Sequence, residues 1–342
     1  MHRLITNKTR LRPEDEYTHP IESEENFNES MYINIFDHKS LTGGWFRVGN
    51  RPNEGHAEMS ACIYLPDGSA GFMFDRPAIS GNDALNAGGM AFEVVEPFKR
   101  LRLTYEGRLC LMKNPLAMAN PRKAFTENPM VECSVDLDYQ SVAPMFGGEL
   151  INDDGSPVTL DPENSFGRAH YEQHVKGTGR IRVGDKEWNI DGLGLRDHSW
   201  GPRYWQAIHY YRWLPMNFSP EFGVMVMLMG RRDGSISTLG IVLRDNEYVP
   251  IDEVRIQSEW DRFHNPTGMT IWAKTAEREY EIKGRVLSLV PLRNRRARPD
   301  GEMLVTRIAE GMTEFTCDSQ VGYGMSEYLD QMVDGQPVGV NV

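Results

Sequence analysis

Alternating apolar and polar positions recur along the chain and predict β-strands as its main elements. Residues 57–63 carry Ala, Met, Ala and Ile at every second position, with Glu, Ser and Cys between them. The same period recurs over residues 131–139, where five residues share one face: Val131, Cys133, Val135, Leu137 and Tyr139. A period of two is typical of a strand that buries one face and exposes the other.

Turn sequences divide these strands at short intervals. Pro66-Asp67-Gly68-Ser69 separates the pattern at 57–64 from the apolar run at 70–74, which predicts a hairpin. Continued along the chain, the pattern gives roughly sixteen to twenty short strands at the spacing of sandwiches and barrels. Only residues 326–333 favour a helix, and no strand–helix alternation supports a doubly wound α/β fold. We therefore expect an all-β protein.

The length of 342 residues is sufficient for about two domains. Residues 141–166 lack a sustained period and are rich in Gly, Pro, Asp and Asn, so we place the boundary there. Residues 1–30 are polar and acidic, and they are expected to form an irregular arm. The two predicted β domains then span residues 31–150 and 167–342.

Composition narrows the class of partners. The net charge is -12, which disfavours binding to nucleic acid. The four cysteines form no Cys-x-x-Cys pair, so we expect buried free thiols in a reducing compartment. Residues 1–26 contain no apolar segment of a secretory signal, and no apolar run reaches the ~18 residues of a spanning helix. We expect a soluble, cytoplasmic protein without stable membrane insertion.

One stretch, Asp191–Trp205, concentrates the candidate chemistry. It reads Asp-Gly-Leu-Gly-Leu-Arg-Asp-His-Ser-Trp-Gly-Pro-Arg-Tyr-Trp, a mixture that no plain strand needs. Asp197 and His198 are a candidate acid–base pair, but neighbours on an extended strand point to opposite faces. One of the two is therefore expected to face a ligand, while the other is structural. Trp200 and Trp205 offer flat surfaces for a hydrophobic ligand.

A second cluster precedes this stretch. His170, Glu172 and His174 lie two residues apart and share one face of a predicted strand. Two imidazoles and a carboxylate can bind a metal ion, and they can equally form a proton-transfer cluster. We favour the polar cluster over the metal site, because strand alternation lines the inside of small barrels in this way.

Residues after the centre of the stretch are candidates for the wall of a pocket. Arg203 can bind a carboxylate or a carbonyl of a ligand, although an ion pair with Asp191 or Asp197 is the preferred interpretation. A following aromatic strand carries further candidates on one face, which are His209, Tyr211 and Trp213. For this strand a pocket wall and an ordinary core are equally good interpretations.

The segment Gly194-Leu195-Arg196-Asp197-His198-Ser199-Trp200-Gly201 resembles the Gly-x-x-Asp-His-x-Trp-Gly motif of the hydroxyneurosporene synthase superfamily. That superfamily includes carotenoid 1,2-hydratase, kievitone hydratase and lipocalin-like Diels–Alderases. The resemblance implies two lipocalin-like β-barrels packed together, a ligand pocket at or between them, and no organic cofactor. It implies pocket roles for Asp197, His198 and Trp200. The longer sequence Arg-Asp-His-Ser-Trp-Gly-Pro-Arg is most similar to a bacterial branch of the superfamily.

These features predict a cofactor-independent lyase or isomerase that acts on a hydrophobic small molecule, with hydration of an alkene as the specific reaction. An acid protonates the double bond, a base activates water, and aromatic faces stabilise the positive charge. The residues assigned to acid–base chemistry are Asp197, His198, Glu172 and His174. The residues assigned to the substrate are Trp200, Arg203, Trp205, His209, Tyr211 and Trp213.

Two other functions fit the same residues. A carrier of lipophilic ligands would bind its ligand without converting it, and a metal enzyme would use His170, Glu172 and His174. Serine hydrolase, NTPase and nicotinamide-enzyme functions have no support, because their motifs are missing from the sequence. The expected partner is a hydrophobic small molecule and not a nucleic acid, and a homodimer is the assembly we allow for.

Overall fold

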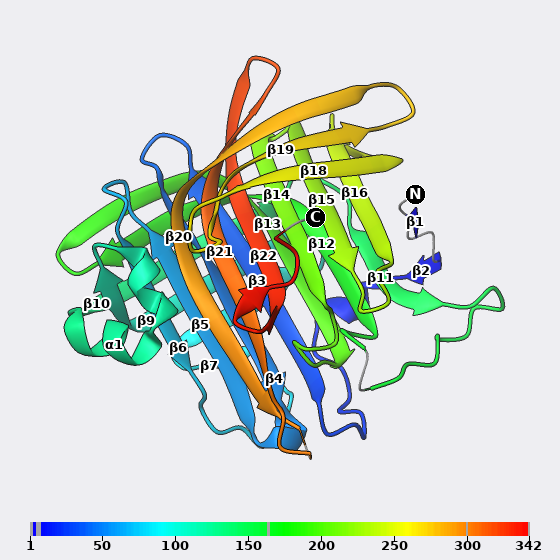
Figure 1. Cartoon of the computed structure of the whole chain (residues 1–342), viewed down its shortest axis with the longest axis horizontal. Coiled ribbons are helices and arrows are strands. Elements are labelled where there is room, and N and C mark those ends of the chain that lie inside the picture. The colour runs from blue at the N-terminus through cyan, green and yellow to red at the C-terminus, as the bar shows by residue number, and fades with distance from the viewer. Residues whose placement is uncertain (1–2, 5–7, 163–164, 299, 341–342) are drawn as a thin grey trace. The chain divides into compact units, whose positions relative to one another are not determined.

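The computed structural model describes residues 3–4, 8–162, 165–298 and 300–340, and its regular structure is nearly all antiparallel β (Figure 1). The expected all-β fold is confirmed. The chain divides into two compact units. The unit that carries the motif, called the motif unit, contains residues 7–113 and 124–204. The C-terminal unit contains residues 1–6, 114–123 and 205–342.

Eight described strands of the motif unit close into a ring in which every neighbouring pair is antiparallel. The order around the ring is β3, β4, β5, β6, β9, β10, β12, β13 and back to β3. The bounds are Phe27–Asp37 (β3), Thr42–Arg51 (β4), His56–Tyr64 (β5), Ala70–Asp75 (β6), Arg100–Met112 (β9), Met130–Ser141 (β10), Ala169–Val183 (β12) and Lys186–Pro202 (β13).

Shorter elements extend this ring at its margins. β11 pairs with β12 and carries β2 on its other side, while β8 pairs with β9 and carries β7. Their bounds are Lys8–Arg10 (β2), Asn86–Ala87 (β7), Met90–Glu96 (β8) and Phe146–Ile151 (β11), with 3-10 turns at Pro13–Glu16 (η1) and Pro52–Glu54 (η2).

Apolar residues at every second position of the ring form the core of the motif unit. The alternation predicted at 57–63 and 131–139 is confirmed, because the apolar residues of both patterns lie in this core, apart from the half-buried Val131 at its edge. Met31, Ile33 and Ile35 of β3 point to the same interior. The four cysteines are buried free thiols, as expected. The inner face of β3 thus defines which side chains of its neighbour β13 point inward.

The C-terminal unit is built on a second antiparallel sheet. Its main strands follow the order β16, β15, β14, β22, β21, β20, β19 and β18, and they surround one apolar core. β1 pairs in parallel with β16. The bounds are Arg3–Leu4 (β1), Tyr210–Ser219 (β14), Phe222–Gly230 (β15), Ile236–Arg244 (β16), Glu247–Pro250 (β17), Glu253–Trp260 (β18), Pro266–Lys274 (β19), Glu279–Ala297 (β20), Met303–Cys317 (β21), Gln320–Val333 (β22) and Gln336–Pro337 (β23).

The observed division of the chain differs from the expected domain boundaries. Residues 169–202 form β12 and β13, which pair with β10 and β3 and therefore complete the first ring instead of starting the second domain. The expected linker contains β11, and the expected arm contains β2 and η1. Parts of that arm and linker, residues 1–2, 5–7 and 163–164, lie outside the described residues.

The helix expected at 326–333 is wrong, because these residues form the second half of β22. They pair with β21 and β14 on either side, and this sheet context outweighs their local preference. The described α-helix is α1, Pro121–Glu127, and η3 at Pro115–Ala119 precedes it. No helix in the described part of the chain has the length and apolar character needed to cross a membrane.

Candidate functional site

β13 presents the motif as a continuous extended strand. His198 is paired with Met31 of β3, whose side chain belongs to the core, so His198 points into the ring. Asp197 is paired with Glu172 of β12 and points to the opposite face. The two neighbours therefore face different surroundings, as strand alternation predicts.

Gly194 allows β13 to approach β3 closely. A Cβ atom at this position would lie 1.9 Å from the backbone oxygen of Asn34. Gly194→Ala is therefore expected to destabilise the motif unit by about 1–3 kcal/mol, the usual cost of overpacking. Gly81→Ala is the matched control, because its Cβ would meet only the Asp83 side chain, at 3.1 Å. Thermal unfolding measures the difference, and equal melting temperatures for the two variants would contradict the prediction.

A buried ion pair lies on the inner face of β12 and β13. Arg196 donates to both carboxylate oxygens of Glu16, with Nη2 2.9 Å from Oε2, and its Nε donates to Gln173 Oε1 at 2.9 Å. Burial disfavours the charge of Glu16, but the hydrogen bonds and charge of Arg196 outweigh it and lower the pKa of this carboxyl. The pair fixes η1 against the ring.

His198 is held at both ring nitrogens. Its Nδ1 lies 2.9 Å from the hydroxyl of Tyr171, and its Nε2 lies 2.9 Å from Glu29 Oε1. The same Glu29 oxygen lies 2.7 Å from Nδ1 of His19. The ring of His19 stacks on Trp200 with a centroid separation of 3.8 Å. This network engages both nitrogens of the fully buried His198 ring and leaves neither for a substrate.

Glu29 is the carboxylate at the centre of this network. Burial alone would raise the pKa of Glu29, but hydrogen bonds from His19 and His198 lower it to about 2. Burial would lower the pKa of His19, whereas its hydrogen bond to Glu29 raises it. Glu29 is thus ionised at neutral pH and favours positive charge on His19.

The opposite face of β12 and β13 gathers the other predicted acid–base residues. His170 Nε2 lies 3.7 Å from Glu172 Oε1 and 3.8 Å from Asp197 Oδ2. Burial would lower the pKa of His170, but Asp197 and Glu172 raise it, so the three residues form an ion-pair group. His174 lies on the same face of β12. Among the described residues, His170, Glu172 and His174 do not bring their donor atoms together, so the metal set considered as the alternative to a polar cluster does not form.

Arg203 lies just beyond β13 and contacts neutral groups. Its Nη2 donates to Ser199 Oγ at 2.8 Å, and its Nε donates to the backbone oxygen of Phe166 at 3.1 Å. The guanidinium also lies over the Phe166 ring, 4.4 Å from its centroid. Asp191, one of the partners expected for Arg203, instead lies 3.3 Å from Lys176 Nζ.

Two glutamates face each other in the C-terminal unit. Glu310 of β21 and Glu327 of β22 are directly paired in the antiparallel ladder, so their side chains share one face. Tyr211 of β14 donates its hydroxyl hydrogen to Glu327 Oε1, and Trp213 is paired with Glu327. Burial and the charge of Glu327 raise the pKa of Glu310 well above its usual value. Both causes favour the protonated form of this carboxyl.

The boundary after residue 204 divides the predicted site residues between the two units. The motif unit contains Asp197, His198, Glu172, His174, Trp200 and Arg203, and the C-terminal unit contains Trp205, His209, Tyr211 and Trp213. Trp205 and His209 precede β14, and burial lowers the pKa of His209. Trp200 points into the ring beside His19, so its predicted place against a substrate is taken by an imidazole.

Several important residues were not predicted from the sequence, namely Glu16, His19, Glu29, Tyr171 and Glu310. Glu16 and His19 belong to the segment that was assigned to a polar arm. Glu29 and Glu310 lie in strands that mix polar and apolar residues, so no signal in the sequence distinguished them as buried carboxylates.

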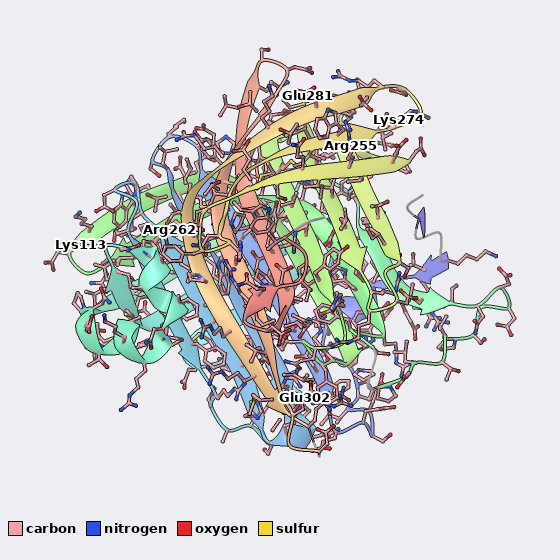
Figure 2. All side chains as sticks on the ribbon, viewed as in Figure 1. Lys113, Arg255, Arg262, Lys274, Glu281 and Glu302 are labelled. Atoms are coloured by element: carbon pink, nitrogen blue, oxygen red, sulfur yellow. The ribbon has the colours of Figure 1, made fainter. Side chains whose placement is uncertain are left out.

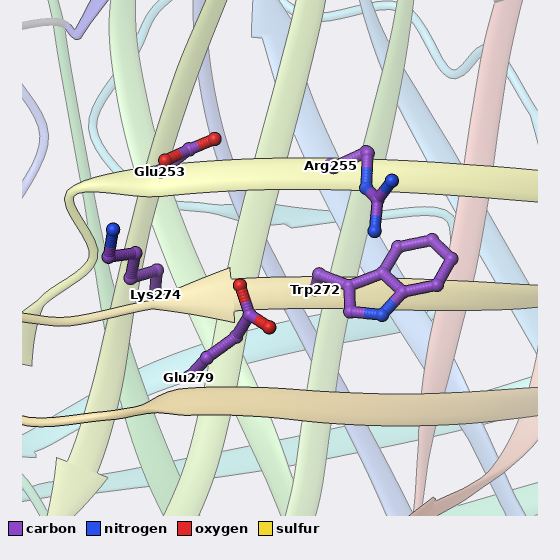
Figure 3. A pocket seen from close by; sticks show the side chains of 5 residues that line it. All are labelled: Glu253, Arg255, Trp272, Lys274 and Glu279. Carbon is purple, nitrogen blue, oxygen red and sulfur yellow. The ribbon is translucent and has the colours of Figure 1, made fainter.

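A surface hollow of about 210 Å³ lies over β18, β19 and β20 of the C-terminal unit. Arg255 lies over the Trp272 ring at 3.8 Å from its centroid, and Glu253, Lys274 and Glu279 complete the lining (Figure 3). Figure 2 labels Arg255 and Lys274 of this lining together with Glu281 of β20. Two acidic and two basic residues in the lining make this a solvated sheet face, not a pocket for a hydrophobic ligand.

A family model matches residues 12–332. The chain belongs to this family, which is described as a domain of unknown function (DUF7064). No curated protein matches the chain in sequence.

Solved structures share the fold over nearly the whole chain. The Nitrosomonas europaea protein provisionally named AttH is 13% identical, with 96% of this chain and 98% of that chain covered and a TM-score of 0.60. Kievitone hydratase from Nectria haematococca is 11% identical, with coverages of 96% and 98% and a TM-score of 0.57. CghA with Sch210972 is 12% identical, with coverages of 92% and 94% and a TM-score of 0.53. This likeness establishes the fold, and the specific branch implied by the motif stays a prediction.

Proposed function

We propose that this protein is a cofactor-independent lyase or isomerase that adds water to, or removes it from, an alkene in a hydrophobic small molecule. The Glu310–Glu327 pair is the observation that carries the proposal. Two buried carboxyls side by side share one proton, since both cannot ionise at low cost. The pair therefore holds a carboxylic acid and a carboxylate at the same place, next to the aromatic rings of Tyr211 and Trp213.

This arrangement supplies each group that hydration needs. Glu310 transfers its proton to one alkene carbon, and the positive charge that forms on the other carbon is stabilised by the π face of Trp213. Water attacks that carbon, and its released proton passes to Glu327. Proton exchange within the pair restores the starting state. Dehydration follows the same steps in reverse.

The residues His170, Glu172 and Asp197 form a second acid–base group, with His174 beside it. We assign protonation of the alkene to Glu310 and not to this group. The reason is that His170 lies within 3.8 Å of both carboxyl groups, which raise its pKa, whereas burial and Glu327 favour the neutral acid form of Glu310. The fold shared with kievitone hydratase supports the choice of reaction class by analogy only.

Incubation of the purified chain with alkenes in oxygen-18-labelled water tests the proposal. Two hydrocarbons, squalene and lycopene, and a more polar prenylated phenol serve as probes. The expected result is an alcohol that carries the labelled oxygen, detected by mass spectrometry. A ligand that co-purifies with the protein, together with no product from it or from any probe, would support the carrier function and overturn the proposal.

A further inference from the structure

We propose that His19, Glu29 and His198 bind one divalent transition-metal ion of the class represented by Zn²⁺. Among the described residues, this is the group of metal-ligating side chains whose donor atoms all lie within 4.8 Å of one another. The site is in the motif unit and is independent of the Glu310–Glu327 pair.

The donor set suits the proposed ion. Two imidazoles and one carboxylate are ligands of zinc and related first-row metals. His19 Nδ1 and His198 Nε2 lie 2.7 Å and 2.9 Å from the same oxygen, Glu29 Oε1. In the absence of an ion these contacts are N–H···O hydrogen bonds. A metal ion would replace the two N–H protons. It would bind the nitrogen lone pairs that they leave and a lone pair of Glu29 Oε1.

Each ligand residue also contacts a second partner through its other polar atom, as in metal sites where surrounding residues orient the ligands. Tyr171 contacts Nδ1 of His198 at 2.9 Å, and Asp15 Oδ1 lies 3.5 Å from Nε2 of His19. The second oxygen of Glu29 accepts from Asn82 Nδ2 and from the backbone nitrogen of His19, both within 2.8 Å. The remaining ring nitrogens and carboxylate oxygen are thus held by these partners, and the other three donor atoms meet at Glu29 Oε1.

The three ligands come from different parts of the chain. His19 lies in the segment between η1 and β3, Glu29 lies on β3, and His198 lies on β13. The side chain of His19 is 19% exposed, while those of Glu29 and His198 are fully buried, so an ion can enter only from the His19 side. A bound metal would tie the segment before β3 to the ring, and we assign it this structural role.

Titration of chelator-treated full-length protein with Zn²⁺, followed by calorimetry and elemental analysis, tests the site. One ion per chain and a higher melting temperature are expected. Co²⁺ is expected to give visible absorption of a site with nitrogen and oxygen ligands. Absence of stoichiometric metal in the folded wild-type protein would overturn the proposal, whatever any variant does.

Matched histidine variants locate the ion. His19→Asn is expected to weaken Zn²⁺ binding by more than about tenfold, and Tyr171→Phe, which keeps all three ligands, by about 10–100-fold. His170→Asn is the control, because His170 lies beside two carboxylates on the opposite face of β12. Binding that survives His19→Asn and Tyr171→Phe but is lost in His170→Asn would place the ion in the other cluster and overturn the assignment.

Discussion

Replacement of Arg196 by methionine is expected to lower the free energy of unfolding of the motif unit by about 3–5 kcal/mol. The side chains of Arg196 and Glu16 are 2% and 0% exposed, so water cannot replace the lost partner. Glu16 would keep two neutral donors, the backbone nitrogen of Phe98 at 2.7 Å and the hydroxyl of Tyr171 at 3.2 Å. Methionine fills much of the volume of arginine, so the loss reports on the uncompensated carboxylate rather than on a cavity.

Two further variants separate the charge from the packing. Glu16→Gln combined with Arg196→Met removes both charges, and it is expected to recover part of the stability that the single variant loses. Arg100→Met is the control in the same unit, because Arg100 and Asp138 form an exposed ion pair. We expect little change there, since solvent already screens that pair. Equal losses for the buried and the exposed substitution would contradict the prediction.

The stability that Arg196→Met loses relative to the wild type is expected to depend on pH. In the wild-type protein the pKa of Glu16 is lowered, so its contribution to stability is present at neutral pH and is lost as the pH falls through the carboxyl range. In Arg196→Met, burial acts without the guanidinium and raises the pKa of Glu16. The variant is therefore expected to differ less from the wild type in acid than at neutral pH, as measured by denaturant unfolding at both.

The alternation of residues along single strands was the part of the fold that could be predicted. Strand geometry requires a period of two, so the apolar faces at 57–63 and 131–139 and the opposed directions of Asp197 and His198 follow from local sequence. The partners of each strand do not follow. β13 pairs with β3, more than 150 residues earlier in the chain, and no local signal marks that pairing.

The candidate site was only partly predictable for the same reason. Glu16 and His19 lie in a segment whose composition is typical of a solvated arm, yet Arg196 and Glu29 make their burial favourable. Glu310 looks like a solvent-facing residue of a strand until β22 places Glu327 opposite it. Pairs of charges that are distant in sequence acquire their chemistry only when the sheet brings them together.

Replacement of Glu310 by glutamine is expected to lower alkene turnover by about 10²–10⁴-fold, the usual contribution of a general acid. Glutamine keeps the size and the buried position but has no proton to donate. Asp197→Asn is the comparison variant, and it is expected to lose less activity because Asp197 belongs to an ion-pair group. A folded Glu310→Gln protein with near wild-type turnover would contradict the assignment.

The pH profile provides an independent test of the Glu310–Glu327 pair. Because the active form carries the proton, turnover is expected to fall as the pH rises through the raised pKa of Glu310. Glu327→Gln removes the like charge while burial persists, so the pKa of Glu310 is expected to fall, even though this variant also loses the base that turnover needs. The infrared carbonyl band of the neutral carboxyl should disappear in Glu310→Gln and follow the same shift in Glu327→Gln, without any substrate. A band that is unchanged in both variants would show that the proton resides on another group, and hydration would then require a different acid.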